Sequence, residues 1–260
     1  MSQVSAVIIA RDEEKNIRRC LESVSWTDEI ILVDSGSQDR TLEIAGEYGV
    51  KSFHRPWNGY GTAKKEAVRR ASGEWILSVD ADEEVPPALR DEIKEITASD
   101  GSRHGYYISR KTMFLGRWIK HCGWYPDYVL RLFRRSYGDF NDAVVHEKVI
   151  LDGEPGRLKN ELLHYSYPTL EDYFRKFSWY TTLGADEAAR KGVRAGWFDI
   201  AVKPALSFLS HYIVRQGFRD GIEGFMVSVL SSIAVMVKYA KVREINRNDQ
   251  TTREKYVERN

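Results

Sequence analysis

Four short apolar runs alternate with helical patterns over the first 80 residues, and this alternation constrains the fold more than any other feature. The apolar runs cover residues 4–10, 29–33, 50–54 and 74–79. Continuous apolar runs of this length are typical of strands that are buried on both faces, as in parallel sheets. Helical patterns cover residues 16–25, 41–48 and 62–71. The order β-α-β-α-β-α-β predicts an α/β fold with a mostly parallel central sheet and right-handed crossovers.

Carboxylates follow the strand predicted at residues 74–79. They are Asp80, Asp82, Glu83 and Glu84. The carboxyl ends of strands bind ligands in open α/β sheets, and Mg²⁺ typically takes one or two protein carboxylates together with substrate phosphates. Asp80 and Asp82 flank the small Ala81, which leaves room for a diphosphate. The alternative is a solvated loop before a helix at residues 88–96, and these residues alone do not decide between the two.

Length and charge exclude several classes of protein. With 260 residues, of which 42% are hydrophobic, the chain can bury a substantial core. Its 39 basic and 38 acidic side chains nearly balance, so the whole chain shows no strong attraction for nucleic acid. The first predicted turn, residues 10–14, contains no glycine, which argues against the glycine-rich dinucleotide and P-loop fingerprints.

The two cysteines, Cys20 and Cys122, lie far apart in the sequence, and neither has a second ligand at metal-site spacing. We interpret both as ordinary thiols. The chain starts with a strand pattern rather than a signal peptide, so we expect a cytoplasmic protein.

Residues 103–135 combine eight Lys or Arg residues with eight aromatic residues and a single acid, Asp127. Aromatic rings among cations suit nucleic acid, and they equally suit a sugar ring beside phosphate groups. Because an acidic cluster precedes this segment, we favour sugar and phosphate and expect no nucleic-acid partner. Strand patterns at residues 106–110 and 129–133 also allow many of these rings to be core residues.

From residue 166 onward the pattern is helical, with helices predicted at residues 170–191, 197–215 and 221–243. The uncharged run at residues 224–237 has 14 residues, fewer than the roughly 20 that cross a bilayer. Two interpretations stay open: helices packed on each other or on a partner subunit, and helices lying in a membrane interface with cations among anionic head groups. We favour the interface, which is compatible with a homo-oligomer formed through the same helices.

Three motifs together resemble the inverting family 2 glycosyltransferases of the GT-A fold. They are VIIARDEE at residues 7–14, ILVDSGSQD at residues 31–39 and the DXD motif DAD at residues 80–82. Three later motifs are similar to the subgroup that includes lipopolysaccharide core β-1,4-glucosyltransferases: GWYPD at residues 123–127, RLFRR at residues 131–135 and VHEK at residues 145–148. The resemblance implies a Rossmann-like GT-A domain at residues 1–165, a helical membrane-associating or oligomerising region at residues 166–246 and a flexible polar tail at residues 247–260.

The resemblance also implies an activity. Members of the subgroup transfer glucose from UDP-glucose to an inner-core heptose, here at the cytoplasmic face of the bacterial inner membrane, to which the enzyme would bind peripherally. Mg²⁺ or Mn²⁺ would stabilise the leaving diphosphate as a Lewis acid. Two alternatives stay open: transfer to polyprenyl phosphate, and a non-catalytic nucleotide-sugar-binding membrane scaffold.

By the resemblance, a set of early residues forms the nucleotide-sugar site: Ala10, Arg11, Glu13, Asp34, Lys64, Asp80 and Ala81. Asp34 would accept a hydrogen bond from the uracil N3–H group, the alternative being a turn cap. Lys64 would reach the nucleotide or its phosphates, the alternative being a solvated helix face. Asp80 would contact the ribose or a metal-bound water. Asp82 would bind the metal ion, with His146 as a further ligand or phosphate contact.

Inversion at the anomeric carbon requires a base on the face opposite the leaving group. Asp127 is the expected base and Glu147 the alternative, while an ion pair with a nearby arginine is the structural role that competes for Asp127. Side chains expected at the acceptor or its phosphates are Trp124, Tyr125, Arg131, Arg134 and Glu147. Glu83 and Glu84 are expected only as charges before the following helix.

Overall fold

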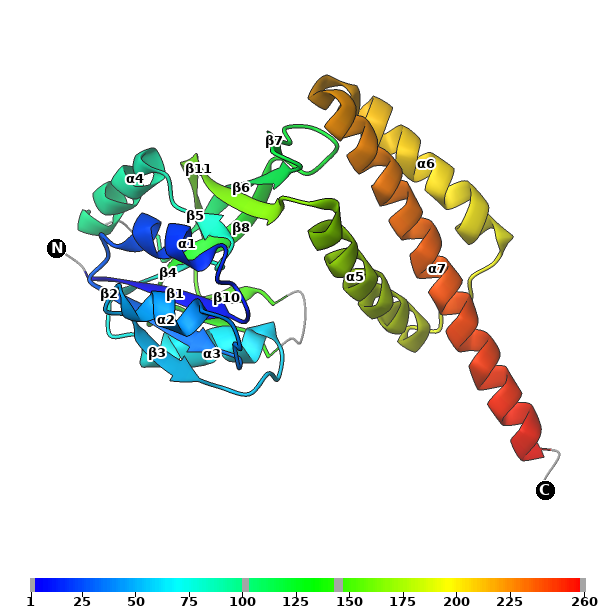
Figure 1. Cartoon of the computed structure of the whole chain (residues 1–260), viewed down its shortest axis with the longest axis horizontal. Helices are drawn as coiled ribbons and strands as arrows, with labels where there is room; N and C mark the ends of the chain where they lie inside the picture. Colours follow the sequence, from blue (N-terminus) through cyan, green and yellow to red (C-terminus); the bar gives the residue numbers. More distant parts are fainter. Residues whose placement is uncertain (1–2, 100–102, 143–146, 258–260) are drawn as a thin grey trace. The chain divides into compact units, whose positions relative to one another are not determined.

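The computed structural model describes residues 3–99, 103–142 and 147–257, with side chains up to residue 248. The chain forms two compact units. The first consists of Met1–Lys111 and Pro126–Tyr165, and the second of Thr112–Tyr125 and Ser166–Asn260. Figure 1 colours the elements of both units along the chain.

The first unit begins with alternating strands and helices. Its strands β1 to β4 are Val4–Ala10, Glu29–Asp34, Lys51–His54 and Trp75–Ser78. Its helices α1 to α4 are Ile17–Val24, Thr41–Gly46, Tyr60–Arg70 and Pro87–Ala98. Every strand and helix predicted in this part of the chain is present, with bounds that differ by only a few residues.

The later strands complete a mixed sheet. They are β5 (Glu83–Glu84), β6 (Gly105–Phe114), β7 (Arg117–Trp118), β8 (Asp127–Arg134), β9 (Gly138–Phe140), β10 (Val149–Leu151) and β11 (Gly156–Tyr167). The main sheet has the order β3-β2-β1-β4-β8-β6-β11-β5, with β7 paired to β6, while β9 and β10 pair separately. Strands β1 to β4 are parallel, whereas β8 is antiparallel to both β4 and β6. The α/β class is therefore confirmed, with the four parallel strands at one end of the mixed sheet.

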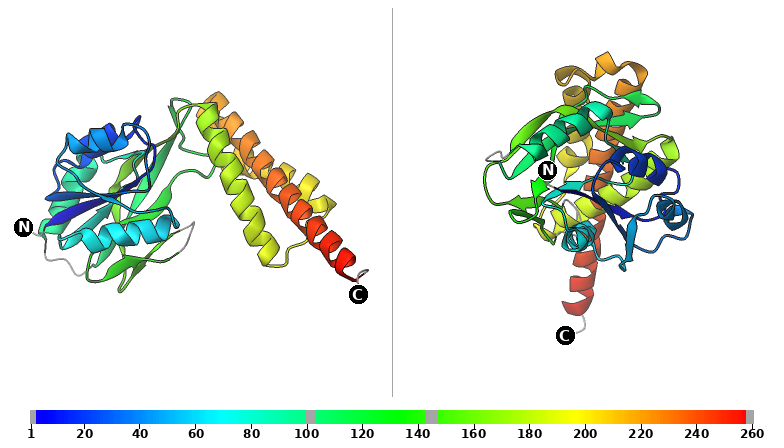
Figure 2. Two further views of the ribbon diagram at one scale, coloured as in Figure 1. Left: turned by 60° about the horizontal axis from the view of Figure 1, so that its bottom comes forward. Right: turned by 90° about the vertical axis from the view of Figure 1, so that its left-hand side faces the viewer.

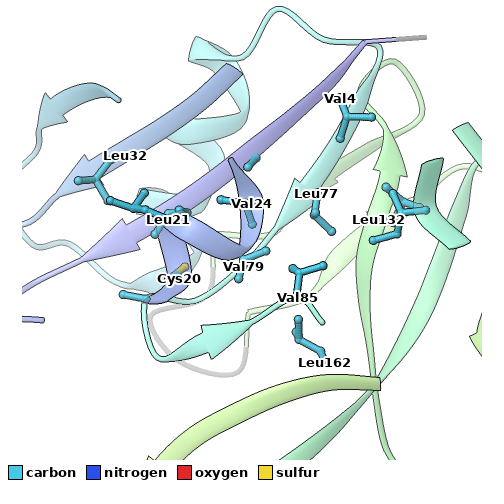
Figure 3. Packing of buried hydrophobic residues seen from close by; sticks show 14 of the residues in the cluster. Val4, Cys20, Leu21, Val24, Leu32, Leu77, Val79, Val85, Leu132 and Leu162 are labelled. Atoms are coloured by element: carbon cyan, nitrogen blue, oxygen red, sulfur yellow. The ribbon is translucent and has the colours of Figure 1, made fainter. Parts of the chain in front are cut away.

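Alternate residues of the central strands face opposite layers of helices. Leu77 of β4 packs with α1 and α4, whereas its neighbour Ile76 packs with α3. Figure 3 shows the first of these layers, where Cys20 and Leu21 of α1 lie in the same cluster as Leu77. Each such leucine contributes about 1.5–3 kcal/mol when it is fully buried, so the two layers fix the sheet between them.

The carboxyl ends of the parallel strands meet at one edge of the sheet, where ligands bind in open α/β folds. Because β8 is antiparallel to β4, its first residue, Asp127, lies toward this same edge. The register pairs Leu77 with Leu132 and Trp75 with Arg134. Arg134 therefore lies near the opposite edge, where β4 begins.

The second unit is helical. Its helices are α5 (Leu170–Arg190), α6 (Lys203–Leu209) and α7 (Gly221–Val257), and π-helical turns flank α6 at Phe198–Val202 and Ser210–Val214. Helix α7 packs along both α5 and α6 (Figure 2). The helix predicted at residues 197–215 is thus irregular. Helix α7 continues to residue 257, so the predicted flexible tail is helical over most of its length.

The segment that joins β6 to β8 packs within the second unit, although the sequence placed it in the first. Phe114 and Cys122 lie in one hydrophobic cluster with Val227 of α7. The buried Asp220 carboxylate accepts a hydrogen bond from the backbone N–H of His121 at 2.7 Å and lies 2.9 Å from its Nδ1 atom. These contacts hold the segment between β6 and β8 within the helical second unit.

Among the described residues, one helical stretch, Gly217–Asn248, is long and apolar enough to cross a membrane by its length and composition. The most apolar 18-residue window of this stretch has a mean hydropathy of 1.6, and 22% of that window is buried. The sequence-based estimate counted only the uncharged residues 224–237, whereas the helix continues past isolated charges on both sides.

Gly73 marks a close approach between the start of β1 and the turn before β4. A Cβ atom at this position would lie 2.5 Å from Ser5 Oγ and 2.9 Å from the Gln3 carbonyl oxygen. We therefore expect Gly73→Ala to lower the free energy of unfolding in urea by about 1–3 kcal/mol. The control is Gly46→Ala in α2, where a Cβ meets nothing within 4 Å and a neutral or stabilising effect is expected. Equal stability of the two variants would contradict this description.

Candidate functional site

Charged side chains from three elements converge at the carboxyl edge of the sheet. Asp80 follows β4, Lys64 projects from α3 and Arg131 from β8. Lys64 Nζ lies 2.8 Å from Asp80 Oδ1, and the guanidinium of Arg131 pairs with both carboxylate oxygens of Asp80. Lys64 and Arg131 are only 3% and 4% exposed. The burial of Lys64 excludes the alternative of a solvated helix face, and the predicted phosphate contacts of Lys64 and Arg131 stay predictions.

The two cations keep Asp80 ionised. Burial by itself raises the pKa of Asp80, but the charges and hydrogen bonds of Arg131 and Lys64 outweigh it and hold this pKa well below the usual aspartate range. Burial likewise opposes the charged form of Arg131, while Asp80 and Glu83 raise its pKa. An ion pair of this kind is costly to break on one side, because the remaining charge stays buried without a partner.

Glu83 is fully buried in the same cluster, which corrects its expected role as a charge before a helix. Its Oε1 atom lies 2.7 Å from Arg131 Nη2 and 3.5 Å from Arg110 Nη1. Its Oε2 atom accepts the Asp80 N–H at 2.8 Å, and its own N–H donates to the Asp80 carbonyl at 2.9 Å. Glu83 therefore closes the loop that carries Asp80 and Asp82.

The pairing of β5 with β11 brings His164 to Asp82. His164 lies opposite Glu83 in the register, and the Tyr165 N–H donates to the Asp82 carbonyl at 2.8 Å. His164 Nε2 then lies 3.4 Å from Asp82 Oδ1. The sequence did not indicate His164, because its nearest ligand partner is 82 residues away and belongs to another strand.

The end of β11 is held in place by a second contact next to Asp82. The Arg19 guanidinium carbon lies 3.5 Å from the centre of the Tyr165 ring. The Tyr165 hydroxyl donates to Glu84 Oε2 at 2.7 Å. Burial and this hydrogen bond raise the pKa of Tyr165 to about 12, so the phenol remains a donor at neutral pH.

The separation of Asp82 and His164 is compatible with two ligands of one divalent cation and also with a direct ion pair. Two ligand atoms that bind one ion at about 2.1 Å lie about 3 Å apart when they are adjacent, close to the separation between Asp82 and His164. Among the residues that the structure describes, no group of three or more His, Cys, Asp or Glu side chains forms a complete metal site. One or two protein ligands with substrate phosphates are common for Mg²⁺. His146, the other expected ligand, lies outside the described residues.

The two candidate bases are both ion-paired. Asp127 Oδ2 accepts hydrogen bonds from Arg110 Nε at 2.9 Å and Nη2 at 2.5 Å, so its partner comes from β6. Glu147 Oε1 lies 2.7 Å from Lys64 Nζ. The side chain of Asp127 is 42% exposed, compared with 18% for Glu147. Asp127 is thus the more accessible of the two to an acceptor.

Asp34 forms a turn at the end of β2. Its carboxylate accepts the backbone N–H groups of Gly36 at 2.9 Å and Ser37 at 3.1 Å, and the Ser37 hydroxyl at 2.5 Å. The structure therefore shows the turn-cap role that the sequence gave as the alternative. Ala10 is buried directly opposite Asp34 in the β1–β2 register.

Arg11 and Glu13 follow β1 at this edge. Arg11 is exposed, with its Nε atom 3.8 Å from Asp12 Oδ2. Glu13 donates its N–H to Thr41 Oγ1 at 2.8 Å, and its carboxylate accepts from Asn16 Nδ2 at 2.9 Å. Both side chains therefore have local partners at the edge where Asp34 and Asp80 also lie.

Arg134 does not join the cluster, contrary to expectation. It pairs with Glu74, and its guanidinium carbon lies 4.8 Å from the centre of the Trp75 ring. Arg134 follows Arg131 by three residues, and a strand rises about 3.3 Å per residue. Arg134 therefore lies at the end of β8, about 10 Å along the strand from Arg131, which lies near its middle.

Trp124 and Tyr125 belong to the second unit. The Trp124 ring centre lies 5.5 Å from that of Tyr167 and 6.1 Å from that of Phe114. Trp124 thus contributes to the aromatic core of that unit, and sugar stacking by Trp124 or Tyr125 stays a prediction.

The sequence profile described as "Glycosyl transferase family 2" matches residues 5–158, more than half of the chain. The chain belongs to this family. It is 30% identical over 251 residues to the lipopolysaccharide core biosynthesis glycosyltransferase LpsC of Rhizobium meliloti, which covers 92% of this chain and 91% of the relative. An uncharacterized glycosyltransferase of Rickettsia typhi is 30% identical over 258 residues, covering 95% and 88% respectively. The crystal structure of S. aureus TarS aligns over 95% of this chain and 92% of its own, at 17% identity and a TM-score of 0.47.

Family membership confirms the resemblance drawn from the early motifs. The motifs at residues 7–14, 31–39 and 80–82 all fall inside the matched range. The chain is therefore a glycosyltransferase of family 2, with a relative in lipopolysaccharide core biosynthesis along almost its whole length.

Lys64 carries an internal charge, whereas its neighbour Lys65 carries a surface charge on the same helix. Lys64 pairs with Asp80 and Glu147, whereas Lys65 is partly exposed and pairs with Asp142. We expect Lys64→Gln to lower the free energy of unfolding by about 3 kcal/mol, because Glu147 loses its ion pair with Lys64 and Asp80 keeps only its pair with Arg131. Lys65→Gln should change it by no more than about 0.5 kcal/mol. Urea titrations of both variants test this prediction. Similar free energies of unfolding for the two variants would contradict the internal ion pairs of Lys64.

Proposed function

We propose that the chain transfers a hexose, glucose from UDP-glucose being the first candidate, onto a lipid-linked saccharide such as the heptose of a lipopolysaccharide inner core. The observation that carries this proposal is Asp82 beside His164 next to the buried Asp80 cluster, in a family 2 glycosyltransferase with a lipopolysaccharide core relative. Transfer proceeds with inversion at the anomeric carbon.

The donor lies along the carboxyl edge of the parallel strands. Ala10, Arg11 and Glu13 border the nucleotide, and Asp34 contacts the uracil. Asp34 is 1% exposed and its carboxylate accepts four hydrogen bonds within the turn, which fills its roughly four lone-pair positions, so the proposed uracil contact requires one of these bonds to be exchanged. Asp80 and Ala81 lie beside the ribose and the diphosphate.

The fit of Asp82 and His164 supports a requirement for Mg²⁺ or Mn²⁺ at this edge. When bound, the cation supplies Lewis-acid stabilisation of the diphosphate as UDP leaves. Lys64 and Arg131 are already neutralised by Asp80, Glu83 and Glu147. Among the described residues of the cluster, little unpaired positive charge is therefore left to neutralise the donor diphosphate. This is why we propose that a metal cation is needed.

Asp127 acts as the base in this proposal. Its exposed carboxylate takes the proton of the acceptor hydroxyl while that oxygen attacks the anomeric carbon. Glu147 is the alternative base, although its partner Lys64 and its lower exposure favour Asp127. We no longer propose Arg134 as an acceptor contact.

The decisive experiment is a screen of sugar nucleotides with Mn²⁺, first for UDP release without acceptor and then for transfer to a truncated lipopolysaccharide core. The proposal expects UDP-sugars to be preferred, and preference for a GDP-sugar would contradict the base contact by Asp34. Transfer to polyprenyl phosphate in the absence of a saccharide would favour that acceptor. UDP binding without hydrolysis or transfer of any donor would favour a non-catalytic scaffold.

Asp82→Ala removes the proposed metal ligand. We expect the turnover of UDP-glucose to fall by about 100-fold or more, because loss of Lewis-acid stabilisation costs several kcal/mol. The matched control is Asp91→Ala, which removes an exposed aspartate of α4 that pairs only locally with Arg90 and should leave turnover unchanged. Near-normal turnover of Asp82→Ala in saturating Mn²⁺ would contradict the proposed role of Asp82 as a metal ligand.

The second unit supplies the proposed attachment to the cytoplasmic face of the inner membrane. Of eighteen exposed large apolar side chains among the described residues, fourteen lie in this unit, which is more than the scattered exposure of soluble proteins explains. Trp197, Val214 and Ile222 are 77%, 74% and 70% exposed. The exposed Arg215 and Arg219 lie between two of them in sequence and suit anionic head groups.

Val214→Glu tests this attachment. Burial of a valine in lipid contributes about 1.5 kcal/mol, so we expect binding to phosphatidylglycerol vesicles to weaken at least about tenfold. The control Ile150→Glu changes an equally exposed apolar residue of the first unit, in β10, and should bind normally. If the unmodified protein binds no vesicles and Val214→Glu instead turns an oligomer into a monomer, the apolar surface serves self-association.

A further inference from the structure

A continuous network of ion pairs links the Asp80 loop to the candidate base. Arg131 bridges Asp80 and Glu83, and Glu83 Oε1 lies 3.5 Å from Arg110 Nη1. Arg110 in turn holds Asp127 through Nε at 2.9 Å and Nη2 at 2.5 Å. The side chains come from β5, β6, β8 and the loop after β4, so the chain of contacts crosses the antiparallel half of the sheet.

Arg110 joins the two halves of this network, because it contacts both Glu83 and Asp127. It lies directly opposite Asp127 in the β6–β8 register. Both of its hydrogen bonds to Asp127 go to Oδ2, and among the described residues no hydrogen bond or ion pair involves Oδ1. A guanidinium has a planar fork of donors, so two bonds to one oxygen hold Oδ2 against Arg110 and leave the second oxygen for a proton.

Glu83 fixes Arg110 from the other side. Glu83 is fully buried, and its Oε2 atom accepts the backbone N–H of Asp80. The same carboxylate therefore contacts the donor loop and the residue that orients Asp127. A buried carboxylate with three partners has little freedom to move, because each lost contact leaves a charge without compensation.

We propose that Arg110 is a positioning residue for the transfer step, holding Asp127 by Oδ2 so that Oδ1 accepts the acceptor proton. The inference rests on the proposed function. In the step, the acceptor O–H bond breaks and its proton goes to Oδ1. The acceptor oxygen forms a bond to the anomeric carbon, and the bond from that carbon to the diphosphate oxygen breaks, its electron pair leaving with UDP.

Three variants test the inference by steady-state kinetics of transfer with UDP-glucose and a truncated lipopolysaccharide core. Arg110→Gln should lower kcat by about 100-fold, at the lower end of the contribution of a positioned base, with the donor KM within about threefold. Arg110→Lys keeps the charge and one donor and should recover about tenfold of this loss. The matched control Lys111→Gln removes the adjacent cation of β6, which pairs with Glu161 at 2.9 Å, and should leave kcat unchanged.

A double variant shows whether Arg110 acts through Asp127. Asp127→Asn and the combination Arg110→Gln with Asp127→Asn should have equal kcat values, because a positioning residue loses its effect when the group it positions is absent. Additive losses would overturn the inference, as would a normal kcat for Arg110→Gln. If Arg110→Gln does not fold, Arg110→Lys alone decides: a lower kcat at constant donor KM supports the inference, and an unchanged kcat overturns it.

The same measurements separate this inference from the proposed function. Wild-type transfer with loss of activity in Asp127→Asn but full activity in Arg110→Gln overturns only the role of Arg110. Full transfer by Asp127→Asn overturns the assignment of the base and, with it, the role of Arg110. Absence of transfer to any acceptor by the unmodified protein overturns both proposals.

Discussion

The carboxylate of Asp80 is ionised inside the first unit because Lys64 and Arg131 lie against it. Lys64 and Arg131 are themselves buried, and a buried charge costs several kcal/mol unless partners compensate it, so the cluster depends on α3 and β8 remaining beside β4. The same contacts bring Glu83 and Glu147 into the cluster. One ion-pair requirement thus ties the parallel half of the sheet to the antiparallel half and sets where the remaining polar side chains lie.

This arrangement also explains why the acidic residues have different partners. Asp80, Glu83 and Glu147 neutralise internal cations, whereas Asp82 lies beside the imidazole of His164. The two aspartates of one motif therefore have different surroundings although a single residue separates them. In the proposed function Asp82 binds the cation, while the pairs of Asp80 and Glu83 hold the loop.

The parallel half of the fold and the place of Asp80 and Asp82 directly after β4 could be predicted from the sequence, because short apolar runs and strand-end carboxylates are local signals. His164 and Arg110 could not, since cross-strand register brings them to Asp82 and Asp127. One signal for Glu83 was available: the alternate residues Val79, Ala81, Glu83 and Val85 are all buried, a period of two that continues the strand pattern past Asp80. The segment between β6 and β8 carries no local sign that its partners are helices near the end of the chain.

The most direct test of the central claim is the calorimetric affinity of UDP for the unmodified protein with and without Mn²⁺. If Asp82 and His164 complete a cation site that receives the diphosphate, UDP should bind at least about tenfold more tightly in Mn²⁺, a gain of about 1.4 kcal/mol. Asp82→Ala should abolish this gain and leave the weak metal-free affinity. Equal affinity of the unmodified protein in the two conditions would contradict the account.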